Sequence, residues 1–159
     1  MAIANASRGG SLIFLSIVFA MILMLLPLPE TLRFFRPEWV LMTLIYWAMA
    51  LPYRVSVGTA WITGLFMDVM MGGVLGVLAL SYSLVIYIII KLHLQLRQYP
   101  VWQQALIIML LILTANIVTV VMSPKAVNWL VLLPVISSTI LWPMIYMLLR
   151  KIRRTFHVN

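Results

Sequence analysis

Six long apolar runs make up most of the chain and constrain its fold more than any other feature. The runs span residues 11–29, 37–52, 55–72, 74–91, 101–123 and 127–149. A helix needs about 20 mostly apolar residues to cross the hydrocarbon core of a bilayer. Of the 159 residues, 65% are hydrophobic and only 9% are charged, whereas soluble domains average about 45–50% apolar and about 25% charged residues. The sequence therefore predicts an all-α integral membrane protein, with six transmembrane helices in a single polytopic domain over residues 1–159.

Prolines and glycines mark where several runs begin and end. Pro37 suits the first turn of the second helix, because an N–H has no partner there, and Pro52 ends that helix. Its sixteen residues form about 24 Å of helix, which is short for a hydrocarbon core of about 30 Å. We therefore expect this helix to stand upright or to have its ends shielded by neighbours. Gly72 and Gly73 predict a tight antiparallel reversal between the third and fourth helices.

The basic residues are distributed unevenly between the two sides of this topology. Eight of the eleven fall on one side, namely Arg8, Arg54, Lys91, Arg97, Arg150, Lys151, Arg153 and Arg154. The other side has Arg33, Arg36 and Lys125. Because positive charge concentrates in cytoplasmic loops, we expect a multi-pass protein of the bacterial inner (cytoplasmic) membrane with both termini in the cytoplasm. The net charge of +8 then reflects topology and indicates no nucleic acid among the partners.

Catalytic and metal-binding patterns are absent from the sequence. The chain has no cysteine, and its two histidines, His93 and His157, are isolated, whereas a metal site needs three or four converging ligands. There is no Ser/His/Asp set, phosphate-binding loop or pair of carboxylates. We therefore expect no enzyme activity, no metal and no cofactor.

Asp68 is the acidic residue that lies inside a predicted span, where a carboxylate is costly. Gly64 and Gly72 flank it at a spacing of four and share its helix face, so another helix can approach closely. In one interpretation Asp68 anchors a partner or ligand in an outward-facing cleft. In the other it pairs with Arg33, Arg36 or a helix end of the same chain. Proton transfer is disfavoured because no second intramembrane acid is present.

Small and polar residues give further candidate sites. Gly72, Gly76, Ala79 and Ser83 predict one helical stripe, either for packing within the chain or for a homodimer. Asn116 is expected at a depth similar to that of Asp68, so it could hydrogen-bond to Asp68 or share a polar pocket with it. Ser138 lies between two prolines, which are residues 134 and 143. These prolines predict a kinked helix with freed carbonyls, which is either ordinary packing or the lining of a cavity.

Charged and aromatic residues also gather at the predicted membrane surfaces. On the outer side, Glu30, Arg33, Arg36 and Glu38 are expected to form a solvated group of salt bridges, and Trp39 to lie in the aromatic belt. On the inner side the last span is followed by a basic cluster of Arg150, Lys151, Arg153 and Arg154. This cluster can set the topology and attract anionic membrane lipids, or it can bind a cytoplasmic protein.

Several segments resemble one known family. They are Arg36-Pro37-Glu38-Trp39-Val40-Leu41, Tyr46-Trp47-Ala48, Leu51-Pro52-Tyr53-Arg54-Val55, Gly64-Leu65-Phe66-Met67-Asp68 with Gly72 and Leu75-Gly76, Trp102-Gln103-Gln104, Leu141-Trp142-Pro143 and Leu148-Leu149-Arg150-Lys151-Ile152-Arg153-Arg154-Thr155-Phe156. In order and spacing they are similar to the rod shape-determining protein MreD family, from about Leu28 to Phe156.

The resemblance implies a non-enzymatic scaffold of the cell-elongation (rod) complex, which links the cytoplasmic filament with periplasmic peptidoglycan synthesis. The implied partners are a bitopic MreC-like protein, the rod-complex polymerase and transpeptidase, and an MreB-like filament. The implied fold is similar to the substrate-binding (S) subunits of energy-coupling-factor transporters. The family's recurrent acid and glycines correspond to Asp68, Gly64, Gly72 and Gly76.

The alternative function is a small-molecule-binding membrane subunit of an energy-coupling-factor type transporter. Those subunits resemble a pattern with Ala-x-x-x-Ala in the first span, but here Ser16, Ala20 and Met24 depart from it. The predicted spans also have few of the converging polar groups that a vitamin site needs. A subunit of a proton-driven motor is disfavoured by the single intramembrane acid.

Overall fold

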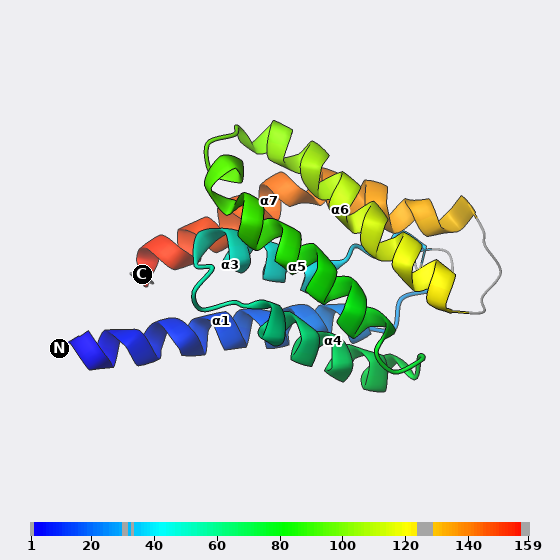
Figure 1. Ribbon diagram of the computed structural model, residues 1–159, viewed down its shortest axis with the longest axis horizontal. Helices are drawn as coiled ribbons and strands as arrows, with labels where there is room; N and C mark the ends of the chain where they lie inside the picture. Colours follow the sequence, from blue (N-terminus) through cyan, green and yellow to red (C-terminus); the bar gives the residue numbers. More distant parts are fainter. Residues whose placement is uncertain (1, 30–31, 33, 124–128, 157–159) are drawn as a thin grey trace.

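The computed structural model describes residues 2–29, 32, 34–123 and 129–156, and these form an all-helical bundle (Figure 1). The α-helices are α1 (Ala2–Leu25), α3 (Trp39–Ala50), α4 (Val57–Met71), α5 (Val77–Leu96), α6 (Val101–Met122) and α7 (Leu133–Thr155), and the 3-10 helix η1 (Trp129–Leu132) leads into α7. The described residues thus contain six α-helices and no strand, in agreement with the predicted fold class. The start of α1 and the end of α7 lie at the same end of the bundle (Figure 1).

The helices differ in how well their lengths suit a bilayer. Helices α5, α6 and α7 have 20, 22 and 23 residues and are apolar enough to cross a membrane. The segment Gly9–Leu25 of α1 and helices α3 and α4 are apolar but shorter. In a bilayer every backbone polar group must find a partner within the protein, and helices achieve this within a single segment. The chain is therefore a helical membrane protein.

Helix α3 is the centre of the bundle. It packs against α1, α5 and α7, and every residue from Val40 to Ala50 is buried. A helix that is apolar on all sides is typical of such a position. The indole N–H of Trp47 donates a hydrogen bond to the Ser16 hydroxyl of α1 at 2.8 Å. With 12 residues α3 is about 18 Å long, shorter than the predicted span, and neighbouring helices cover its sides.

Several predicted boundaries were wrong at prolines and glycines. Pro37 lies outside α3, because Glu38 is its N-cap. Helix α5 begins at Val77, three residues later than predicted. Pro134 lies in the first turn of α7, where a proline breaks no internal hydrogen bond, so it frees no carbonyl in mid-helix. Helix α7 continues to Thr155, so the basic cluster forms its last turns instead of following it.

Candidate functional site

Asp68 is bound by the start of the next helix. Its side chain is only 2% exposed. Its Oδ2 accepts hydrogen bonds from the N–H groups of Gly76 at 2.9 Å and Ala79 at 3.3 Å, and its Oδ1 accepts one from Leu78 at 3.0 Å. The first N–H groups of a helix have no partner within the helix and carry partial positive charge. Asp68 therefore pairs with a helix end of its own chain, and its role toward a partner remains a prediction.

The glycines around Asp68 shape the α4–α5 hairpin. A Cβ added at Gly64 would lie 2.4 Å from the Cα of Ala79, so the two helices touch backbone to backbone. Gly72 and Gly76 adopt left-handed φ angles of 64° and 92°, which favour glycine. The predicted stripe was wrong in its geometry, because Gly72 ends α4 and Gly76 precedes α5. These two glycines form a turn and share no helix face with Ser83.

A second group of predicted residues meets where α1 ends and α3 begins. The guanidinium of Arg36 donates hydrogen bonds to the carbonyls of Met24 and Leu26, which lack partners at the end of α1. The Glu38 N–H donates to the Ser138 hydroxyl of α7 at 2.9 Å. The structure thus joins Arg36 to the end of α1 and Glu38 to Ser138 of α7. Trp39 follows Glu38 as the first residue of α3.

The expected solvated salt-bridge group was wrong for Glu38. One of its carboxylate oxygens, Oε2, is shielded from solvent and has no hydrogen-bond partner. Glu30 and Arg33 lie outside the described residues. The hydroxyl of Tyr82 in α5 is likewise buried without a hydrogen-bond partner. Sequence patterns could not single out Tyr82, because a tyrosine within an apolar run has no distinguishing neighbours.

Asn116 does not bond to Asp68. Its Nδ2 donates to the carbonyl of Ile112 at 3.0 Å, in its own helix α6. The polar link between α5 and α6 is instead formed by the hydroxyls of Ser81 and Thr119, which are 3.3 Å apart. The predicted Asn116–Asp68 hydrogen bond is therefore wrong.

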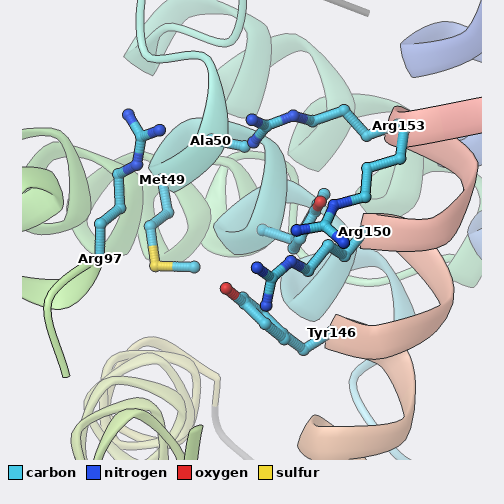
Figure 2. A pocket seen from close by; sticks show the side chains of 8 residues that line it. Met49, Ala50, Arg97, Tyr146, Arg150 and Arg153 are labelled. Atoms are coloured by element: carbon cyan, nitrogen blue, oxygen red, sulfur yellow. The ribbon is translucent and has the colours of Figure 1, made fainter. Parts of the chain in front are cut away.

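The basic cluster at the end of α7 forms one wall of a cavity of about 220 Å³ (Figure 2), which we call the basic cavity. Its lining residues are Tyr46, Met49 and Ala50 of α3, Arg97 at the end of α5, and Tyr146, Arg150, Arg153 and Arg154 of α7. In Figure 2 the hydroxyl of Tyr146 points into the space between Arg97 and Arg150. Lys151 of the predicted cluster is exposed and does not line this cavity.

A second, almost purely apolar hollow of about 350 Å³ lies between α1 and α7, and we call it the apolar groove. Its lining residues are Leu12, Leu15, Ser16, Phe19, Ala20, Leu23, Trp39, Thr43, Met144, Ile145, Leu148, Leu149, Ile152 and Phe156. Helices α1 and α7 each pack on α3, which contributes Trp39 and Thr43 to the groove. Such a surface can accept an apolar helix or an acyl chain but has no means of chemical catalysis.

Metal binding has no support in the part of the chain that the structure describes. There, no group of three or more His, Cys, Asp or Glu side chains is placed to hold an ion. Three features are the candidate sites: the Asp68 hairpin, the basic cavity and the apolar groove.

Comparisons with known proteins agree over nearly the whole chain. A model of the family described as "rod shape-determining protein MreD" matches residues 7–152. A protein of Haemophilus influenzae described as "Rod shape-determining protein MreD" is 36% identical over 141 residues, which cover 86% of this chain and 87% of the relative. No solved structure matches the chain.

Proposed function

The chain belongs to the MreD family of rod shape-determining proteins, and from this premise we propose that it acts as a scaffold of the cell-elongation complex in the bacterial inner membrane. Members of this family determine cell shape and are not enzymes. The uneven distribution of basic residues, with α1 starting and α7 ending on the same side of the bundle, supports an orientation with both termini in the cytoplasm.

The apolar groove is the observation that best supports a scaffold. We propose that it receives the transmembrane helix of a single-span, MreC-like partner. Ser16 and Ala20 are small residues in its wall, and small residues allow helices to approach closely within a membrane. Phe19 and Leu148 expose 61% and 53% of their surface there, so a partner helix would find large side chains to pack against. The polymerase, the transpeptidase and the MreB-like filament would join the assembly through this partner or directly.

Depletion in a rod-shaped host tests the role in cell shape. We expect the depleted cells to become round while nutrient uptake stays normal, and the wild-type protein to restore rods. Cells that remain rod-shaped after complete depletion would contradict the proposal. The alternative, a vitamin-transport subunit, predicts normal shape with poor growth on limiting vitamin. Neither this alternative nor the likeness to energy-coupling-factor S subunits gains support from the family match, and the likeness of fold remains a prediction.

Cross-linking tests the position of the partner. The chain has no cysteine, so a single introduced thiol reports one position. We expect Phe19→Cys to cross-link to a single-span protein when cells are treated with a membrane-permeant bifunctional reagent, one end of which alkylates the thiol while the other carries a photoreactive group that inserts into the partner. Ile117→Cys on α6 is the matched control, because Ile117 is similarly exposed, at 54%, but lies outside the groove. Equal cross-linking at both positions would place the partner elsewhere.

A further inference from the structure

The basic cavity holds more positive charge than the acidic side chains that the structure describes can neutralise. It is lined by four arginines, while the acidic side chains among the described residues are Glu38 and Asp68. Asp68 binds the start of α5, and the cavity lies at the end of this 20-residue helix, about 30 Å away. Glu38 precedes the 12-residue helix α3, and the last residues of α3 line the cavity. The length of α3, about 18 Å, therefore separates Glu38 from the cavity. Neither carboxylate can therefore form an ion pair with the arginines of the cavity, because such a pair needs its charged atoms within about 4 Å of one another.

Helix dipoles offset only part of this charge. Helices α3, α5 and α7 all end at or near the cavity, and each helix C-terminus carries about half a negative charge. Three such ends supply roughly −1.5 against the four positive charges. The remaining surplus of more than two positive charges is open to the outside, because Arg97, Arg150 and Arg154 are exposed, so an external anion can reach it.

Tyr46 adds a second, independent sign of a missing partner. It lines the cavity and is 1% exposed. Its hydroxyl is shielded from solvent, and the nearby guanidinium of Arg153 can only donate a hydrogen bond, so the O–H of Tyr46 has no acceptor. Because buried hydroxyls nearly always have a partner, this group indicates that an acceptor binds in the cavity. The hydroxyl of Tyr146 is also turned inward (Figure 2).

The depth of the cavity in the membrane indicates the source of the anion. Met147 and Leu148 on α7 expose large apolar side chains of the kind that face lipid. Arg153 follows Leu148 by five residues, or about 7.5 Å along the helix. Trp102, near the start of α6, is also exposed, and tryptophan favours the membrane interface. The cavity therefore lies at the level where lipid phosphates are always present.

From these observations we propose that the basic cavity is a binding site for the phosphate head group of an anionic membrane lipid. Arginines form paired hydrogen bonds with phosphate oxygens, and basic pockets between transmembrane helices are suited to lipid head groups. The hydroxyls of Tyr46 and Tyr146 donate further hydrogen bonds to the phosphate. This site does not depend on the proposed scaffold role.

The test uses the full-length protein in a mild detergent, with lipid binding followed by native mass spectrometry. Phosphatidylglycerol should bind at one molecule per chain, at least about tenfold more tightly than phosphatidylcholine. Replacing both Arg150 and Arg153 by Gln should weaken phosphatidylglycerol binding by about tenfold or more, because two charge-assisted hydrogen-bond donors are lost. Tyr46→Phe should weaken it several-fold by removing a single hydroxyl.

Lys151→Gln is the matched control, because it removes one charge from the same turn of α7 outside the cavity. It should change binding less than twofold. An equal loss in Lys151→Gln and in the double arginine variant would mean diffuse attraction and would overturn the proposal. Displacement of the lipid by an equal concentration of inorganic phosphate would assign the site to a free anion, and displacement by a hexaglutamate peptide would assign it to an acidic protein segment. If the double variant fails to fold, Tyr46→Phe decides the question.

Discussion

Asp68 and the arginines of the basic cavity lie near opposite ends of α5, and only Asp68 has its charge balanced by groups of its own chain. Three backbone N–H groups of the same chain surround the Asp68 carboxylate. The four guanidinium groups at the other end line an open hollow. A charge whose partners all come from its own chain stabilises the fold, since removing it leaves buried donors unpaired. A cluster of like charges without such partners lowers the stability of the fold through mutual repulsion. Such a cost is expected where the charges serve to bind a ligand.

The largest effect should come from breaking the paired region at Asp68. Asp68→Ala leaves the N–H groups of Gly76, Leu78 and Ala79 without an acceptor, and each buried orphan costs about 1–3 kcal/mol. We expect the free energy of unfolding to fall by about 3 kcal/mol or more, together with the membrane level of the protein. Thermal unfolding in detergent and quantitative blotting measure both.

Asp68→Asn tests the same contacts with a side chain of nearly the same shape. Its amide N–H₂ replaces one acceptor oxygen and would face backbone N–H donors, so stability should again fall. A level and stability equal to wild type in Asp68→Asn would contradict the capping role and would favour a site for a partner.

Gly64→Ala should have the next largest effect. The added methyl would collide with the backbone of Ala79 at 2.4 Å, so α4 and α5 must move apart. Such overpacking costs about 1–3 kcal/mol and would pull Asp68 away from its donors. Gly73→Ala is the control, because nothing lies within 4 Å of an added Cβ there. Similar melting temperatures for both variants would contradict the close approach of the two helices.

Ser138→Ala should have a moderate effect. Ser138 is fully buried and accepts the hydrogen bond of the Glu38 N–H, so the substitution should cost about 1 kcal/mol. Ser137→Ala is the comparison, because the Ser137 hydroxyl bonds only back to the carbonyl of Pro134 in its own helix. If the two variants unfold at the same temperature, the link between α3 and α7 contributes nothing measurable.

The smallest effect on stability is expected in the basic cavity. Substituting Gln for Arg150 and Arg153 removes like charges that repel one another, so the free energy of unfolding in lipid-free detergent should change by less than about 0.5 kcal/mol or rise slightly. Added phosphatidylglycerol should raise the melting temperature of the wild type more than that of the variant. A large loss of stability without lipid would mean that these arginines serve the fold, as Asp68 does.

The contacts of Asn116, Asp68 and Glu38 differ from those predicted because of one limit of sequence patterns. Periodicity indicates which residues share a helix face, but not which helices meet. Asn116 and Asp68 were expected at one depth, yet each found its partner elsewhere, in its own helix or in α5. Glu38 was read as a surface charge because its neighbours are charged, whereas α7 approaches it and binds its N–H. Sequence patterns could not predict the apolar groove either, because its two walls, α1 and α7, are separated by more than 100 residues.

The sequence by itself determined that this is a helical membrane protein, because so much apolar surface has no place in a soluble fold and helices satisfy their backbone internally. It also determined the family, through segments spread over nearly the whole chain. Only the tertiary structure brings Arg97 together with Arg150, Arg153 and Arg154 around one cavity, where the O–H of Tyr46 has no acceptor. The physical reason is that helix ends distant in sequence come together only when α3 is buried among its neighbours.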